Sequence, residues 1–341
     1  QAIGVLCLIF ILFSGGLDTD LQAARRVAAP AIVLATFGVF ISAAVIAVAA
    51  YLLLDFSALQ GFLLGAVIAS TDAAAVFAIV RAQSEPLRKD LASMIELESG
   101  SNDPSAIFLV GAMLLLLAQP DAPVWTLAPN FVQQMVFGAG VGVAIGLSMS
   151  GVLKRARLRV GGMALVVSVA GALLAYGVAG VIGGNGFLSA YIAGIVAGSR
   201  AFMNKRDVLV FQDGVAWLAQ VVMFVTLGLL VFPSELPDVV WPGLAITAVL
   251  MFVARPLSVV LCLLPFRRFD WPAILFVSWA GLRGAVPIVL ATFPIVAGVP
   301  GAQTIFNIVF FVVVTSSIIQ GTTLGALARA LKLTEGPPEQ S

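Results

Sequence analysis

Residues 279–294 read WAGLRGAVPIVLATFP, an apolar stretch that contains a single arginine. Gly281, Gly284 and Pro287 surround this residue, Arg283. Glycine and proline together predict an interrupted helix, because glycine is flexible and proline removes a backbone donor. A simple proline kink is the alternative when the stretch is considered alone. The stretch therefore predicts a discontinuous helix with a positive charge at its break.

The composition of the whole chain is that of a membrane protein. Of its 341 residues, 61% are hydrophobic and 10% are charged, and the mean hydropathy is +1.10. A soluble domain carries about 25% charged residues. Apolar runs of about 20 residues recur, which is the length that a helix needs to cross a bilayer. Since a transmembrane barrel would show alternation instead, the sequence predicts an all-α polytopic protein in a lipid bilayer.

Several function classes are excluded by what the sequence lacks. The chain contains no histidine, which excludes imidazole-based catalysis and histidine metal sites. Cys7 and Cys262 lie in separate apolar runs and predict neither a disulfide framework nor a metal site. The net charge is +1 and Lys and Arg form no block, so nucleic acid is not an expected partner. An enzyme is the least expected class, because no nucleophile–base pair and no cofactor motif is visible.

Eleven apolar segments follow one another along the chain, at about 2–17, 28–54, 58–80, 91–118, 130–153, 162–183, 186–200, 211–233, 243–264, 272–297 and 303–328. No soluble domain or long linker separates them, so residues 1–333 are expected to form one transmembrane domain. The tail 334–341, TEGPPEQS, is expected to be disordered. Gln1 opens directly into an apolar run, and we expect N-terminal helices to be missing before it.

The distribution of Lys and Arg predicts the orientation of these segments. The basic residues occur in every second connection and again after the last segment, which follows the positive-inside rule. The basic connections and the C-terminus are therefore expected in the cytoplasm, with Gln1 outside. Only Arg255 and Arg283 lie inside apolar segments and away from the segment ends.

Four carboxylates also lie inside apolar segments and away from the segment ends: Asp72, Glu96, Glu98 and Asp103. Each intramembrane charge costs about 2.5–3.5 kcal/mol on insertion scales, so such residues are candidates for function. The alternative is a set of structural ion pairs, but two arginines neutralise only two acids. Glu96 is expected near the cytoplasmic end of its helix, whereas Asp103 lies about 20 Å along that helix from Lys89. At least one carboxylate near the membrane midplane therefore lacks an obvious countercharge.

A second interruption is predicted within residues 68–76, IASTDAAAV, because Thr71 and Asp72 can hydrogen-bond to their own backbone. The two interrupted segments are seven elements apart in the chain, so they run in opposite directions. Such a pair is typical of an inverted repeat in which two discontinuous helices cross near the midplane. Asp72 would then neutralise the positive N-terminal helix ends at the crossing, and Arg283 the negative C-terminal ends.

Residues 96–104 read ELESGSNDP and place their polar groups on two neighbouring stripes of one helix. At about 3.6 residues per turn, Glu98 and Asn102 share one stripe, and Ser99 and Asp103 share the next. One stripe can therefore face a structural partner while the other faces the crossing.

The two stripes have different expected partners. Arg255 is the expected partner of Glu98, because removing either would leave a buried charge unpaired. Asp103, Ser99 and the loosened backbone near Thr71 offer oxygens of the kind that bind an alkali cation. A carboxylate in a low-dielectric site can bind a proton or a cation, but not both at once. That competition is sufficient for exchange, provided that the site crosses the membrane only when one of them occupies it.

Three motifs together resemble one known family: STDAAAVF at 70–77, ESGSNDP at 98–104 and SWAGLRGAVPIVLA at 278–291. The chain is similar over nearly its whole length to the monovalent cation:proton antiporter-1 family, and most similar to its bacterial NhaP-type potassium/proton branch. The resemblance implies a thirteen-helix fold of the sodium/proton antiporter kind, with a core and a dimerisation subdomain. It also implies a homodimer in the cell's inner membrane.

The resemblance also implies roles for individual residues. The ion- and proton-binding region would be formed by Asp103, Asn102, Ser99, Thr71 and Asp72. Within it, a monovalent cation would bind at Asp103, Ser99 and Thr71, while Glu98 and Arg255 would form a stabilising pair. Asparagine before Asp103 resembles the members that exchange one cation per proton. Ser14 is a departure, because many relatives have an acid at this position.

The expected function is the electroneutral exchange of a monovalent alkali cation for protons by alternating access, with potassium favoured and sodium as the alternative cation. Proton and cation would compete for Asp103, and no cofactor is expected. A sodium-coupled symporter for an organic anion on a related scaffold is one alternative. It would need cationic or polar groups for the anion beyond Arg283. A cation channel is another alternative, but it would need a continuous pore and usually a repeated filter, and no such filter is visible in the sequence.

Overall fold

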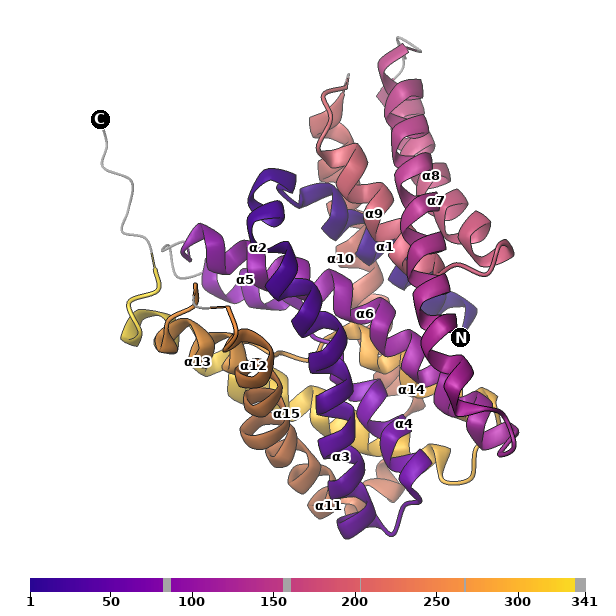
Figure 1. Ribbon diagram of the computed structural model, residues 1–341, viewed down its shortest axis with the longest axis vertical. Coiled ribbons are helices and arrows are strands. Elements are labelled where there is room, and N and C mark those ends of the chain that lie inside the picture. The colour runs from indigo at the N-terminus through magenta and orange to yellow at the C-terminus, as the bar shows by residue number, and fades with distance from the viewer. Residues whose placement is uncertain (82–86, 156–160, 203, 267, 335–341) are drawn as a thin grey trace. The chain divides into compact units, whose positions relative to one another are not determined.

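The computed structural model of the chain describes residues 1–81, 87–155, 161–202, 204–266 and 268–334. Nearly all of these residues are helical (Figure 1). The tail that is expected to be disordered lies outside the described residues from position 335 onward. Three residues of the basic connections, Arg157, Arg159 and Arg267, also lie outside them.

The chain divides into two compact units. Unit 1 comprises Gln1–Ala24 and Asp121–Thr226, and unit 2 comprises Arg25–Pro120 and Leu227–Ser341. All the polar and charged residues predicted for the ion-binding region belong to unit 2.

The described part of unit 1 is built from α1 (Ala2–Asp18), the 3₁₀ helix η2 (Val124–Thr126), α7 (Leu127–Arg155), α8 (Gly161–Val181), α9 (Gly186–Gly198) and most of α10 (Lys205–Leu230). Glycines let α1 and α9 approach closely. A Cβ atom on Gly16 would overlap the carbonyl oxygen of Tyr191, and one on Gly194 would overlap that of Phe13. Such backbone contact through small residues is the usual way in which membrane helices pack.

The described part of unit 2 contains two sets of helices. The first comprises most of α2 (Leu21–Val33), the π-helical turn η1 (Leu34–Gly38), α3 (Val39–Leu54), α4 (Ala58–Ala69), α5 (Ala73–Arg81) and α6 (Lys89–Ala118). The second comprises the 3₁₀ helix η3 (Pro233–Glu235), α11 (Leu236–Val249), the π-helical turn η4 (Leu250–Ala254), α12 (Arg255–Leu263), α13 (Trp271–Trp279), α14 (Ala285–Val296) and α15 (Ala302–Ala330).

The two sets repeat one order of elements: a segment with a π-helical turn, an interrupted segment and one long helix. Ser42 Oγ donates to Ser258 Oγ at 3.1 Å, and these residues are 216 positions apart. The same offset separates Leu34 from Leu250, which begin the two π-helical turns. The two halves of unit 2 are thus related as repeats and touch at equivalent serines. This repetition agrees with the odd spacing of the interrupted segments in the sequence.

Both segments that are predicted to be discontinuous are interrupted in the structure. α4 ends at Ala69 and α5 begins at Ala73, while α13 ends at Trp279 and α14 begins at Ala285. The two breaks lie against each other, because the backbone N–H of Asp72 donates to the carbonyl oxygen of Leu282 at 2.9 Å. The crossing of two discontinuous helices is therefore a feature of unit 2.

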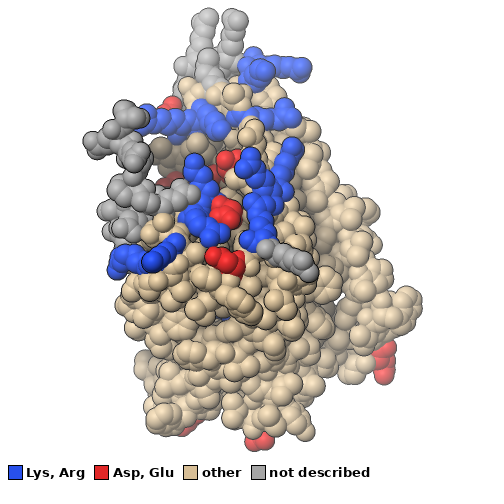
Figure 2. All heavy atoms as spheres, turned by 60° about the vertical axis from the view of Figure 1, so that its left-hand side comes forward, with Lys and Arg blue, Asp and Glu red and all other residues tan. Residues whose placement is uncertain are grey.

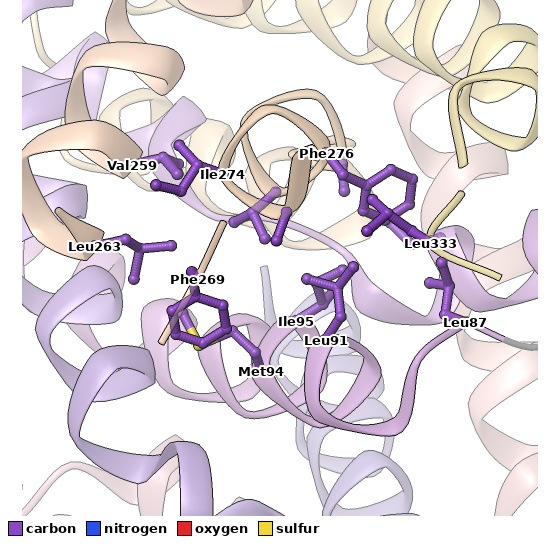
Figure 3. Close-up of a cluster of buried hydrophobic side chains, with 14 of the residues drawn as sticks. Leu87, Leu91, Met94, Ile95, Val259, Leu263, Phe269, Ile274, Phe276 and Leu333 are labelled. Carbon is purple, nitrogen blue, oxygen red and sulfur yellow. The ribbon is translucent and has the colours of Figure 1, made fainter. Parts of the chain in front are cut away.

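A buried apolar cluster positions α6 within unit 2 (Figure 3). The side chains that α6 contributes include Leu91, Met94 and Ile95, and they face Phe269 and Phe276 from the second half (Figure 3). Such side chains hold membrane helices together mainly through van der Waals packing, because lipid tails are as apolar as the side chains themselves. The cluster thus holds the first turns of α6 against the second half, so that the polar stretch further along α6 meets the breaks.

The described helices agree with a membrane-spanning architecture. Seven helical stretches are long and apolar enough to cross a membrane, and four shorter apolar helices, α1, α4, α9 and α14, accompany them. Exposed charged side chains gather in a patch where acidic groups lie between basic ones (Figure 2). In unit 2, for example, an Arg88 Nη2 atom lies 3.2 Å from Asp90 Oδ2, and Arg88 Nη1 lies 3.7 Å from Asp270 Oδ1.

Candidate ion-binding site

α6 supplies hydrogen bonds that the first break has lost. Ser99 Oγ donates to the carbonyl oxygen of Thr71 at 2.5 Å and accepts from the N–H of Ala73 at 2.9 Å. Asn102 Oδ1 accepts from the N–H of Thr71 at 3.4 Å. Because buried backbone groups need partners, these contacts make a break at residues 70–72 tolerable inside an apolar environment.

Glu98 and Arg255 form a buried, two-pronged ion pair. Arg255 Nη1 lies 2.9 Å from Glu98 Oε1, and Nη2 lies 3.1 Å from Oε2. Their side chains are only 6% and 1% exposed. Arg255 is the first residue of α12, directly after the π-helical turn η4. The structure thus contains the pair that the sequence predicts.

Asn102 is hydrogen-bonded to this ion pair. Its Nδ2 donates to Glu98 Oε1 at 3.0 Å and to Thr71 Oγ1 at 2.6 Å. Thr71 Oγ1 in turn donates to Glu98 Oε2 at 3.3 Å. The side chains of Asn102 and Thr71 are therefore engaged with Glu98, while the carbonyl oxygen of Thr71 keeps a second lone pair in addition to its bond from Ser99.

Asp103 stands apart from this network. Its side chain is buried, and Oδ1 accepts a hydrogen bond from the hydroxyl of Ser70, the first residue of the break. Among the described residues, no Lys or Arg pairs with it. Ser70 is not among the residues predicted from the sequence, although it is the first residue of the motif STDAAAVF. Its only signal in the sequence is a hydroxyl group at the point where the helix is weakened.

Arg283 caps the first broken helix. Its Nη1 donates to the carbonyl oxygens of Ala69 and Ser70, at 2.6 and 2.7 Å, and its side chain is buried. These carbonyls are the negative end of α4, so a positive charge there is favourable. The role that the sequence predicts for Arg283 corresponds to this position.

Asp72 lies at the positive end of two helices. Its Oδ1 accepts from the N–H of Ala75 in the first turn of α5, at 3.1 Å. A Cβ atom on Gly284 would overlap Asp72 Oδ2, so the carboxylate lies directly against the start of α14. Only glycine leaves room for this approach.

Two other residues noted in the sequence lie elsewhere. Glu96 is partly buried in the first part of α6, and Ser14 is buried in α1 of unit 1. The described residues contain no group of three His, Cys, Asp or Glu side chains that could hold a metal ion. A cation at this site would therefore depend on one carboxylate together with hydroxyl and backbone oxygens.

A buried carboxylate beside two crossing helix breaks can be compared with known proteins. The profile of one family, described as sodium/hydrogen exchanger, transmembrane, matches residues 1–330. The chain belongs to this family. It is a family of multi-pass cation/proton exchangers and not of enzymes, which confirms the resemblance seen in the sequence.

Two individual proteins are similar to this chain over nearly its whole length. The chain is 41% identical over 336 residues to the K(+)/H(+) antiporter NhaP2 of Shewanella sp. strain ANA-3, covering 98% of this chain and 58% of that protein. It is 42% identical over 342 residues to the K(+)/H(+) antiporter NhaP of Alkalimonas amylolytica, covering 99% of this chain and 59% of that protein. The chain thus spans somewhat more than half the length of these relatives.

The fold of this chain is also that of a solved structure. The sodium proton antiporter MjNhaP1 from Methanocaldococcus jannaschii superposes with a TM-score of 0.81 at 24% sequence identity, over 96% of this chain and 85% of that chain. The predicted all-α antiporter fold is therefore confirmed.

Proposed function

We propose that the protein exchanges a monovalent alkali cation for protons, with potassium favoured over sodium and one cation moved per proton. The observation that carries this proposal is Asp103, a buried acid without a described Lys or Arg partner at the crossing of two broken helices. The two relatives named as K(+)/H(+) antiporters support potassium as the favoured cation.

Exchange follows from competition at one carboxylate. The low-dielectric surroundings disfavour an empty, charged Asp103, so the site is occupied either by a proton or by a cation. Asp103, Ser99 and the carbonyl oxygen of Thr71 provide cation ligands, and Ser70 provides a hydroxyl beside them. Each occupant neutralises the carboxylate and lets the loaded site change its exposure from one side to the other.

The neighbouring charges keep the rest of the site neutral during this cycle. Glu98 and Arg255 neutralise each other, while Arg283 and Asp72 lie at helix ends of opposite sign. Asp103 then contributes the only charge that changes. One cation per proton is therefore the stoichiometry that the arrangement favours.

We further propose that the protein is a homodimer in the inner membrane, with its C-terminus in the cytoplasm and without a cofactor. The alternation of basic connections supports the orientation. Membership of the antiporter family supports the proposed homodimer and the proposed absence of a cofactor.

An anion symporter receives less support from the geometry. Such a protein needs a cationic group for the anion, but Arg255 is engaged by Glu98 and Arg283 by the carbonyls of α4. A channel differs from an exchanger in that its ion current needs no proton movement.

The full-length protein in proteoliposomes tests the proposed function. Vesicles carry an internal pH dye and an imposed pH gradient, and potassium or sodium is added with and without a potential clamp. Exchange predicts proton movement that needs an external cation and does not respond to voltage. Ion current without obligatory proton movement would favour a channel.

A further inference from the structure

The second break is held by α15. Gln320 Nε2 donates to the carbonyl oxygen of Trp279 at 2.9 Å, and Ser316 Oγ accepts from the N–H of Arg283 at 3.2 Å. Ser316 Oγ also donates to Gln320 Oε1 at 2.6 Å, which joins the two side chains into one network. Ser316 and Gln320 are 0% and 1% exposed. Two peptide groups released by the interruption are thus satisfied by one pair of side chains.

The first break is held in a corresponding way. There, Ser99 and Asn102 of α6 bind the peptide groups on either side of Thr71. In each half of unit 2 the long third helix therefore supplies a hydroxyl and an amide, one turn apart, to its own break. The two pairs differ in their neighbours, because α6 carries Asp103 whereas the sequence of α15 contains no Asp or Glu.

Ser316 and Gln320 are connected to the ion-binding site through Arg283. Ser316 holds the backbone of Arg283, and the guanidinium of Arg283 holds the carbonyl oxygens of Ala69 and Ser70. The hydroxyl of Ser70 then contacts Asp103. A shift of the second break would therefore displace Ser70 and alter the oxygens around Asp103.

We propose that Ser316 and Gln320 are positioning residues that set the affinity of the exchanger for its cation. The pair touches no ion itself and acts through Arg283 and Ser70. The inference rests on the proposed exchange function, since it assigns to α15 a role in the site where the cation binds.

Two substitutions and a control separate this role from general stability. Ser316→Ala removes the hydroxyl that joins the network, and Gln320→Met removes the amide while keeping a side chain of similar length. Thr322→Val is the matched control, because Thr322 is exposed on the same helix and its described hydrogen bonds go to carbonyls of that helix. Each variant, and the Ser316→Ala/Gln320→Met double variant, is reconstituted at equal amounts of folded protein.

The measurement is the initial rate of proton movement as a function of external potassium concentration. Each single substitution is expected to raise the half-saturating concentration about three- to tenfold, the factor that one hydrogen bond represents, with a smaller change in maximal rate. The double variant is expected to match the larger single effect, because both side chains act in one network. The control is expected to behave like the wild type.

Two results would overturn the proposal. An unchanged half-saturating concentration in both variants, with only the amount of folded protein reduced, would show that the pair serves stability alone. Additive effects in the double variant would show that the two residues do not act as one unit. Failure of the exchange function itself has a different signature, because the wild type would then show no cation-dependent proton movement and the proposal would fall with it.

Discussion

Asp103 is the residue on which the proposed exchange depends. Its carboxylate is buried at the first break, and Ser70 is its described hydrogen-bond partner. We predict that Asp103→Asn abolishes cation-dependent proton movement, because an amide neither binds a proton nor neutralises a cation. The loss is expected to exceed a factor of about 100 in initial rate, equivalent to at least ~2.7 kcal/mol.

Glu96→Gln is the control for this substitution. Glu96 lies on the same helix about two turns before Asp103, and it is partly buried where Asp103 is buried. Its substitution is expected to leave the rate near that of the wild type. A normal exchange rate in well-folded Asp103→Asn would show that another group carries the proton.

The buried ion pair of Glu98 and Arg255 is expected to stabilise the folded protein. Glu98→Gln leaves the guanidinium of Arg255 buried without its countercharge, and breaking such a pair costs about 3–5 kcal/mol. We predict a clear fall in the melting temperature measured in detergent, with little change in ion preference. Asp238→Asn removes an exposed acid of the same unit and should leave the melting temperature unchanged. Equal melting temperatures for wild type and Glu98→Gln would contradict a stabilising role for the pair.

Charge determined which residues the sequence could reveal. Asp72, Asp103 and Arg283 stand out in apolar segments because an intramembrane charge is costly. Ser70 and Ser316 do not, because a hydroxyl in a membrane helix can bond to its own backbone at little cost. Ser70 and Ser316 therefore became visible only in the structure.

The two helix breaks place charge at helix ends, and Gly284 makes this possible for α14. A Cβ atom there would overlap Asp72 Oδ2. We predict that Gly284→Ala lowers the maximal exchange rate about tenfold, because interactions of charges with helix ends are worth up to ~2 kcal/mol and this one would be displaced. Gly111→Ala on α6 is the control, since a Cβ atom there meets no other atom within 4 Å. An unaffected rate for Gly284→Ala would mean that the close approach is unimportant for transport.

The π-helical turns show where prediction of elements from the sequence stops. Proline and glycine near Arg283 predict one break, and Thr71 with Asp72 predicts the other. The turn η4, LMFVA, contains neither glycine nor proline, yet it directly precedes Arg255 and its ion pair. Pro256 follows two residues after the turn and lacks a backbone N–H, but a proline alone does not predict whether a helix kinks or takes a π-helical turn.

The proposed orientation of the protein in the membrane rests on its basic connections. We predict that a cysteine placed at Lys332, in a variant with Cys7 and Cys262 replaced by serine, reacts with membrane-impermeant maleimide only from the cytoplasmic side. A cysteine at Asp121, in the connection after α6, should react from the opposite side. Labelling of both positions from one side would contradict the proposed topology.

The positions of helices could be predicted from apolar runs alone, because the structure has helix in each of the eleven segments. Seven helical stretches among the described residues are long and apolar enough to cross a membrane. The division into two compact units could not, because each unit combines segments that are distant in the chain. Hydropathy reports which segments enter the membrane, whereas side-chain packing decides which of them associate.

Competition between proton and cation at Asp103 is the central claim, and the pH dependence of cation affinity tests it most directly. The half-saturating potassium concentration is measured in proteoliposomes over a range of external pH at fixed internal pH. Competition for one carboxylate predicts a rise of about tenfold for each unit of pH decrease at the acidic end of the range, with a plateau at the alkaline end. A half-saturating concentration that stays constant while only the maximal rate changes with pH would mean that protons and cations bind at separate sites.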